Sequence, residues 1–323
     1  MKTNKNAARL DGALPQTNGA IMLTDGGLET TLVFLDGRDL PAFASFPLVS
    51  SGEGRERLRS YYRDYARAAA DVGLGFVAEA PTWRAHHDWG SELGYDTAAL
   101  RAVNMEAVQL MRTIGEEVGM PRPWVNSGNI GPRGDGYAIA DAMSVAEAAA
   151  YHEAQVAAFA DASADMILAL TLNYAAEARG VVRAAKRFDM PCAIGLTVET
   201  DGRLPSGQPL GEAVREIDGE AGGPAYFVVN CAHPEHITRA TAEGGAWRER
   251  VLGIRANASR CSHAELDEAE ELDAGDPHDL ADGVLGLQKH FPNLSVFGGC
   301  CGTDVRHVKE MAVRLARHAP IAA

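Results

Sequence analysis

The sequence predicts an α/β protein folded as a single (β/α)8 TIM barrel, and three observations support this fold class. Short apolar, β-branched runs alternate along the chain with longer amphipathic stretches, which is typical of a parallel sheet with helical crossovers. Eight such runs occur in 323 residues, and this number fits a closed barrel better than an open doubly wound sheet. No linker, low-complexity segment or break in composition divides the chain, so we expect one domain over residues 20–323.

The apolar runs are the expected strands. In chain order they are Ile21–Thr24, Gly75–Glu79, Trp124–Gly128, Met166–Leu172, Cys192–Thr197, Ala225–Asn230, Val251–Ile254 and Leu294–Gly298. The stretches between them predict helices, among them Arg55–Val72, Leu100–Val118, Ser144–Ala162 and Ala175–Phe188. Two long connections remain, Asp36–Gly52 and Thr200–Gly223. The second is rich in Gly, Pro and Asp, and we expect it to form a loop over the mouth of the barrel.

Composition and charge narrow the class of protein. Apolar residues make up 46% and charged residues 23% of the chain, which is ordinary for a soluble globular enzyme. The net charge is −14, and the chain has no basic run, so nucleic acid is not an expected partner. The acidic balance mildly favours a cationic substrate, although solubility explains it equally well. Five cysteines, an odd number in a long chain, do not suggest a disulfide scaffold.

The start of the chain bears on its expected location. Residues 1–19 are polar and lack the apolar core of a signal peptide, and we expect them to be a flexible segment ahead of the barrel. No apolar run is long enough to span a bilayer, so a membrane is not an expected partner. The cytoplasm is the expected location, and the sequence leaves a homo-oligomer open.

Three cysteines are the strongest candidates for chemistry. Cys231 in FVVNCAHP and the pair Cys300-Cys301 in VFGGCCGTD each follow an apolar run directly. At the carboxyl ends of late barrel strands, their sulfur atoms could converge on one metal ion. Three thiolates suit Zn²⁺, and a fourth position left open would make the site catalytic. Buried core thiols or a disulfide between the neighbouring pair are about equally compatible with the spacing, because no CxxC pattern is present.

Other polar residues also fall directly after expected strands, where a (β/α)8 barrel gathers its active site. Asp25-Gly26-Gly27 follows the first strand. There the glycines permit close approach of the backbone to a ligand, and Asp25 could bind an ammonium group. An ordinary Asp-Gly turn is the alternative. Glu79 ends the second strand and Trp83-Arg84 follows it, which puts a carboxylate, a ring and a guanidinium close together.

These segments together resemble one family. LTDGGLET, SGNIGPRG, VVNCAHP and GGCCGTDVRHV, in this order, are similar to the homocysteine S-methyltransferase family, from about residue 21 to about residue 313. The resemblance implies a (β/α)8 barrel in which Cys231, Cys300 and Cys301 hold zinc. It implies transfer of a methyl group to a thiol, with homocysteine, which gives methionine, as the expected acceptor. The implied substrate contacts are Asp25, Gly26, Gly27, Glu79, Thr171 and Asn230.

Departures from the family pattern put the acceptor in question. Many members have a Glu-Thr pair at the end of the fourth strand, and that Glu helps to bind the amino group of homocysteine. Here Leu170 takes the place of the Glu, whereas Thr171 is retained. A Leu side chain accepts no hydrogen bond, so either Asp25 or Glu79 compensates or the acceptor is another thiol.

The methyl donor is also left open by the sequence. Methionine synthases carry folate and corrinoid domains that these 323 residues do not contain, so we expect a small onium donor or a methylated carrier protein. Residues placed to contact a donor, or a carboxylate on either substrate, are Trp83, Arg84, Tyr174, Arg255 and Asn257. For the two arginines, exposed surface positions are an equal alternative. For the aromatic residues, packing at the barrel mouth is the alternative.

Other functions remain compatible with the sequence. A zinc-binding barrel of this type could act on a different thiol, or as a demethylase or hydrolase. It could also be a binding relative without catalytic activity. Leu170 motivates these alternatives, and an assay with several donors and thiols would separate them from methyl transfer to homocysteine.

Overall fold

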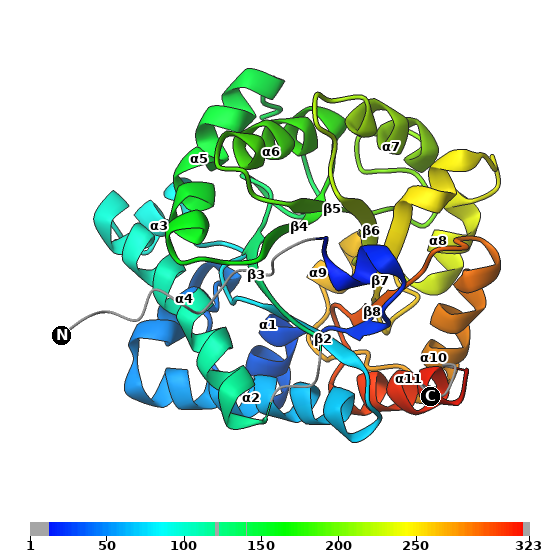
Figure 1. Cartoon of the computed structure of the whole chain (residues 1–323), viewed down its shortest axis with the longest axis horizontal. Coiled ribbons are helices and arrows are strands. Elements are labelled where there is room, and N and C mark those ends of the chain that lie inside the picture. Colours follow the sequence, from blue (N-terminus) through cyan, green and yellow to red (C-terminus); the bar gives the residue numbers. More distant parts are fainter. Residues whose placement is uncertain (1–12, 120–122, 140, 319–323) are drawn as a thin grey trace.

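A closed barrel of eight parallel strands forms the centre of the computed structural model, which describes residues 13–119, 123–139 and 141–318. The strands neighbour one another in sequence order, and β1 pairs with β8 to close the ring (Figure 1). This confirms the predicted (β/α)8 barrel. The strands are β1 Met22–Leu23, β2 Gly75–Glu79, β3 Trp124–Ile130, β4 Met166–Leu172, β5 Cys192–Leu196, β6 Tyr226–Asn230, β7 Val251–Ala256 and β8 Val296–Gly299.

Helices cover the outside of the barrel (Figure 1). The longer ones are α2 Gly52–Asp71, α4 Thr97–Glu117, α5 Val145–Asp161, α6 Ala175–Arg187, α7 Leu210–Asp218, α8 Pro234–Ala240, α10 Pro277–Gly286 and α11 Val305–His318. Short helices lie in the connections: α1 Leu28–Thr30, α3 His87–Glu92 and α9 His263–Asp267. Because both faces of the sheet are covered, the strands are near-continuous apolar runs rather than alternating ones, which is why they stand out in the sequence. No helix in the described part of the chain is long and apolar enough to cross a bilayer.

The stretch Thr200–Gly223 corrects one expectation. It was expected to form a loop over the barrel mouth, but it contains α7, the helix that follows β5. Leu210, Val214 and Ile217 are buried along one side of this helix, with the spacing of an amphipathic helix. Gly and Pro residues on both sides hide this period in the sequence. None of the residues of this stretch lines the cavity at the mouth.

The amino-terminal end of the barrel is closed by a short 3-10 turn, Pro15–Asn18. The side chain of Gln16 is buried and donates a hydrogen bond to the Tyr226 hydroxyl at 3.2 Å, at the start of β6. Its backbone oxygen accepts from the Ser295 hydroxyl at 2.9 Å, next to β8. This dark blue turn lies in front of the barrel in Figure 1. Of the segment expected to be flexible, residues 1–12 lie outside the described residues.

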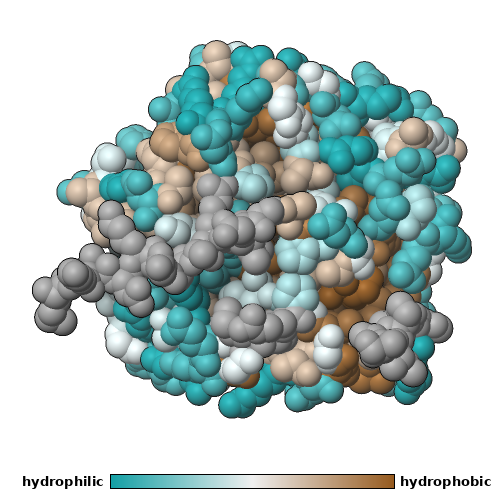
Figure 2. All heavy atoms as spheres, in the orientation of Figure 1, coloured by the Kyte–Doolittle hydropathy of each residue, from teal (hydrophilic) through white to brown (hydrophobic). Residues whose placement is uncertain are grey.

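The two ends of the barrel therefore differ. The end that carries the turn faces the viewer in Figures 1 and 2, where hydrophilic side chains dominate the periphery and hydrophobic ones gather over β7 and β8. Behind it, α9 lies across the opposite opening (Figure 1), and Leu266 and Asp267 of this helix line the cavity there. The carboxyl ends of the strands, where any chemistry takes place, thus lie at the opening of the barrel opposite the amino-terminal turn.

Candidate metal centre and substrate pocket

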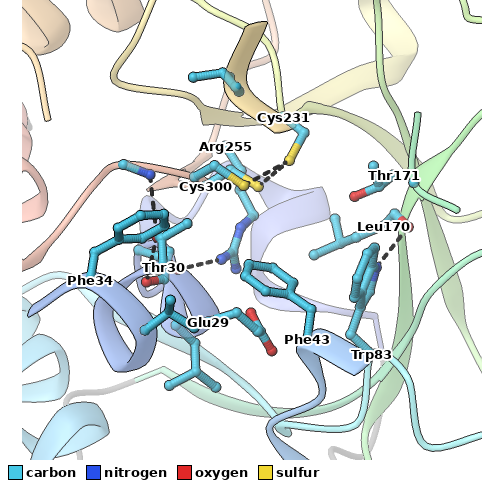
Figure 3. Close-up of a pocket in the computed structure, with 18 of the residues that line it drawn as sticks. Glu29, Thr30, Phe34, Phe43, Trp83, Leu170, Thr171, Cys231, Arg255 and Cys300 are labelled. Carbon is cyan, nitrogen blue, oxygen red and sulfur yellow. Dashed lines mark hydrogen bonds between the residues drawn. The ribbon is translucent and has the colours of Figure 1, made fainter. Parts of the chain in front are cut away.

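Three thiols meet at the carboxyl ends of β6 and β8. The sulfur of Cys231 lies 2.6 Å from that of Cys300 and 3.7 Å from that of Cys301, and all three lie within 4.8 Å of one another. None of them is in a disulfide. Figure 3 shows Cys231 and Cys300 pointing toward one another from different segments. No other group of three or more His, Cys, Asp or Glu side chains in the described residues has a spacing that suits a metal ion.

The end of β7 holds both cysteine segments in place. The amide of Cys231 donates to the carbonyl of Arg255 at 3.0 Å, and the amide of Cys300 donates to the carbonyl of Ala256 at 2.8 Å. Cys231 has φ of +54°, a conformation that non-glycine residues adopt at a cost. The chain therefore accepts a strained backbone at the residue whose thiol reaches its two partners.

The chemistry of this donor set fits a divalent metal ion. The contact with Cys300, together with burial, raises the pKa of the Cys231 thiol well above its ordinary value. The contact with Cys231 likewise raises the pKa of Cys301. Three adjacent thiols cannot all ionise without positive charge between them. A soft divalent cation supplies that charge and prefers sulfur ligands, so the cluster could hold a metal.

A histidine and a tyrosine support the cluster, and sequence reasoning did not include this histidine in the site. His263 of α9 is buried, with Nε2 lying 2.7 Å from the carbonyl oxygen of Cys231 and Nδ1 lying 2.9 Å from Glu199. The Tyr137 ring stacks on it at 3.9 Å, and the Tyr137 hydroxyl lies 3.5 Å from the sulfurs of Cys231 and Cys301. No local motif marks His263, because its partners are distant in the chain.

A cavity of about 430 Å³ opens beside the thiols. The sequence-predicted residues that line it are Asp25, Gly26, Gly27, Glu79, Trp83, Arg84, Thr171, Cys231, Arg255, Cys300 and Cys301. Three predicted residues do not line it. Asn230 lies behind Thr171, to which its side chain donates at 2.8 Å, whereas the Tyr174 hydroxyl accepts from the amide of Met143 at 3.0 Å. The amide of Asn257 donates to the carbonyl of Ala232 at 3.1 Å.

Arg255 occupies the two carboxylates that were expected to bind an ammonium group. Its guanidinium forms ion pairs with Asp25 at 2.9 Å and with Glu79. The second oxygen of Asp25 accepts from the Tyr61 hydroxyl at 3.2 Å. Asp25, Glu79 and Arg255 are all buried. Burial raises the pKa of Glu79 to about 7, although the charge of Arg255 opposes the shift.

The Gly-Gly turn after β1 is tightly packed against the second cysteine segment. A Cβ atom on Gly27 would lie 2.6 Å from the carbonyl oxygen of Cys300, and one on Gly26 would lie 2.6 Å from the Tyr65 hydroxyl. The amide of Gly27 donates to the carbonyl of Thr303 at 3.0 Å. The glycines therefore serve close packing of β1 against β8, in addition to any contact with a ligand.

Leu170 and Thr171 form the wall of the cavity at the end of β4 (Figure 3). The Leu170 side chain is almost completely buried and its carbonyl accepts from the Trp83 indole at 3.3 Å. Thr171 has φ of +62°, and its amide donates to the side-chain oxygen of Asn230 at 3.0 Å. The wall thus presents an alkyl group at the position where the family pattern has a carboxylate.

Two connections contribute lining residues that sequence reasoning missed. Glu29, Phe34 and Phe43 come from the connection between β1 and α2. Residues between Ser259 and Asp273, in the segment between β7 and α10, contribute others, including the acidic side chains of Asp267, Glu271 and Asp273. Glu29 lies within the LTDGGLET motif, but no motif covers Phe34, Phe43 or the segment between β7 and α10.

The fold and the site together define a class of protein: a (β/α)8 barrel with a three-thiol cluster and a small-molecule cavity at the carboxyl ends of its strands. The chain belongs to the homocysteine S-methyltransferase family, whose model matches residues 22–315. The resemblance that the sequence motifs indicate is thereby confirmed.

Similar proteins include methionine synthases and a homocysteine methyltransferase. The chain is 26% identical over 317 residues to methionine synthase of Mycobacterium tuberculosis, which covers 92% of this chain and 25% of that protein. The methionine synthase of Mycobacterium leprae is 26% identical over 164 residues, or 49% of this chain and 13% of that protein. The chain thus spans a quarter or less of the length of these two relatives. The metallated form of the homocysteine methyltransferase MmuM from Escherichia coli has a TM-score of 0.72 at 21% identity, over 92% of this chain and 96% of that one, which supports the fold.

Proposed function

We propose that this protein is a zinc-dependent thiol S-methyltransferase, which moves a methyl group from a small onium donor to a thiol, with homocysteine as the expected acceptor. One observation carries the proposal: in a chain of the homocysteine S-methyltransferase family, three thiols from two distant segments meet beside a cavity of about 430 Å³. The names of the similar proteins support homocysteine as the acceptor and methionine as the product.

Zinc is the metal that this donor set favours, with Cys231, Cys300 and Cys301 as its ligands. Zinc binds thiolates well, and three protein ligands with a fourth position left for a substrate are typical of catalytic zinc sites. When bound, Zn²⁺ supplies the positive charge that keeps thiols deprotonated at neutral pH.

The transfer itself needs placement more than acid or base catalysis. The sulfur of the acceptor forms a bond to the methyl carbon while the bond from that carbon to positive nitrogen or sulfur breaks. The electron pair stays on the departing atom, and the proton of the thiol goes to solvent. In-line placement of the two substrates accounts for much of such an acceleration. Leu170, Phe43 and Trp83 provide apolar parts of the cavity wall (Figure 3).

The charge of the cavity supports a cationic donor. Its lining has seven acidic side chains against two basic ones, which makes it strongly negative. The acidic residues are Asp25, Glu29, Glu79, Asp135, Asp267, Glu271 and Asp273, and the basic ones are Arg84 and Arg255. Betaine, S-methylmethionine and S-adenosylmethionine all carry the positive methylated atom that such a cavity attracts.

A donor and acceptor screen tests the proposal. Purified protein loaded with zinc is expected to convert homocysteine to methionine with at least one of the three donors, as measured by mass spectrometry of the product. Cys300→Ala is the matched control, because it removes one sulfur ligand and leaves the barrel core intact. Absence of turnover with every donor, at one zinc per chain, would contradict the proposal.

A second candidate is the same transfer to a thiol that lacks an α-amino group. Two observations favour it: Leu170 replaces a carboxylate, and Arg255 already pairs with Asp25 and Glu79. Turnover of 4-mercaptobutanoate, which is homocysteine without its amino group, at a rate above that of homocysteine would favour this candidate.

A further inference from the structure

We propose that Arg84 is the receptor for a carboxylate group of a substrate bound in this cavity, a proposal that rests on the proposed function for the identity of that substrate. Arg84 follows Trp83 in the connection after β2 and lines the same cavity as the three thiols. The cavity has one other basic lining residue, Arg255, and the two differ in what surrounds them.

Arg84 has no ion-pair partner among the described residues, whereas Arg255 has two. One terminal nitrogen of Arg84 donates to the carbonyl oxygen of Ala42. Its Nε atom is buried without any hydrogen-bond partner. A partly buried guanidinium whose N–H groups lack partners is costly to keep. Arg84 donates no other hydrogen bond to the described residues, so a carboxylate bound in the cavity could pair with the N–H groups at its open edge.

Two of the three acidic residues whose charge stabilises Arg84 are engaged elsewhere, and the third, Glu92, forms no ion pair with it. Glu29 accepts a hydrogen bond from the Ser45 hydroxyl at 2.7 Å. Asp135 accepts from the amides of Tyr137 and Ala138 at 2.7 and 3.1 Å. Both stabilise the positive charge of Arg84 at longer range, while burial lowers its pKa from the ordinary value. Acidic residues therefore surround the guanidinium of Arg84, but none of them forms a direct ion pair with it.

Aromatic rings fix the orientation of the guanidinium. Its central carbon lies 4.0 Å from the ring centre of Trp89, 5.0 Å from that of Trp83 and 6.0 Å from that of Phe43. Figure 3 labels Phe43 and Trp83 among the side chains that line the cavity. Stacking on rings holds the guanidinium in place while its N–H groups stay available at the edge. Such a planar fork suits a carboxylate, which it can bind through two parallel hydrogen bonds.

The carboxylate can belong to either substrate, since betaine-type donors and homocysteine both carry one. Binding measured by calorimetry on zinc-loaded protein distinguishes the two sources without requiring turnover. One pair of ligands is homocysteine and 3-mercaptopropylamine, which lacks the carboxylate. The other pair is betaine and choline, in which a hydroxymethyl group replaces the carboxylate. The wild-type protein is expected to prefer the carboxylate member of at least one pair by tenfold or more.

Substitution of Arg84 is expected to abolish that preference. Arg84→Met keeps the length and apolar stem of the side chain. It should weaken binding of the preferred carboxylate ligand at least tenfold, while the affinity for the paired ligand without a carboxylate stays unchanged. Arg84→Lys keeps the positive charge but not the planar fork, so its affinity for the carboxylate ligand should lie between those of the wild type and Arg84→Met. It also keeps the test informative if the methionine variant does not fold. Arg67→Met is the matched control, because Arg67 is exposed on α2.

Several outcomes would overturn this role of Arg84. They are an unchanged preference in both Arg84 variants, no preference for a carboxylate in the wild type, and no binding of any of the four ligands. Methyl transfer with an unchanged preference in Arg84→Met would leave the proposed function standing and remove only the role of Arg84. Loss of the preference in Arg84→Met, in a protein that shows no methyl transfer with any donor, would support the role of Arg84 and contradict the proposed function.

Discussion

At the scale of single residues, two side chains determine the chemistry of the cavity lining. Leu170 places an alkyl group where a carboxylate is common, and Arg255 pairs with both Asp25 and Glu79. Neither could be interpreted fully from the sequence. The position of Leu170 is predictable because it lies near the end of a strand. The partners of Arg255 follow β1 and end β2, and they meet it only when the ring closes.

Leu170→Glu tests the importance of the missing carboxylate. We expect the variant to bind homocysteine about tenfold more tightly, because a charged hydrogen bond to the ammonium group contributes about 1.5–3 kcal/mol before the cost of burying the new carboxylate. Calorimetry on zinc-loaded protein measures the change, with Leu170→Gln as the neutral control of equal size. Binding of 4-mercaptobutanoate should not improve. Equal or weaker binding of homocysteine would show that its amino group is held elsewhere.

Glu79 predicts a pH dependence of stability. Its pKa is raised by burial from 4.5 to about 7, so between these pH values the folded protein binds more protons than the unfolded chain. The free energy of unfolding contributed by this group therefore falls as pH rises through that window, by at most about 1.4 kcal/mol per pH unit.

Denaturant unfolding of metal-free wild type and of Glu79→Gln at pH 4.5 to 7 measures this effect. The glutamine variant cannot titrate, so the stability of the wild type relative to it should decrease with rising pH. A constant difference across the window would mean that Glu79 has an ordinary pKa in the folded protein.

At the scale of elements, the three-thiol cluster depends on how the β1 turn packs against the segment after β8. Gly27 leaves no space for a side chain because the carbonyl of Cys300 lies over it. The Asp-Gly-Gly turn was expected to contact substrate, and its tight packing against Cys300 is a second constraint that the sequence alone does not show. Pairing of β1 with β8 brings these distant segments together.

Gly27→Ala should therefore weaken metal binding as well as stability. The added methyl group pushes against the backbone of Cys300, and overpacking of this kind typically costs about 1–3 kcal/mol. Competition with a chromophoric chelator measures zinc affinity, and denaturant unfolding measures stability. Gly286→Ala in α10 is the control, since a Cβ there meets nothing within 4 Å. Unchanged zinc affinity in Gly27→Ala would show that metal binding does not depend on the packing of this turn.

At the scale of the whole molecule, the strand pattern was predictable to within a few residues, and Gly75–Glu79 and Met166–Leu172 have the expected bounds. Buried parallel strands are apolar on both faces, so they are visible in the sequence. The features that could not be predicted from the sequence are those that depend on loops or on closure of the ring. They include the course of α7, the contact of His263 with Cys231, and the lining residues contributed by the segment between β7 and α10.

Removal of zinc should lower the melting temperature without unfolding the barrel. The ligands sit at strand ends and the apolar core lies outside the cluster, so the metal adds stability only by binding the folded state. Zinc at a hundredfold excess over its dissociation constant adds about 2.7 kcal/mol, or roughly 5 °C for a protein of this size. Calorimetry with and without a chelator measures the shift. Cys300→Ala should show none, and loss of the circular dichroism spectrum on chelation would contradict this view.

The placement of the thiols directly after β6 and β8 has a consequence for biosynthesis. A nascent chain that has left the ribosome as far as β6 carries Cys231 alone, and its two partners follow 69 and 70 residues later. The strand that brings them is the one that joins β1 and completes the ring. The three-thiol cluster therefore forms only once the ring has closed, and an ion held by all three thiols would bind after assembly.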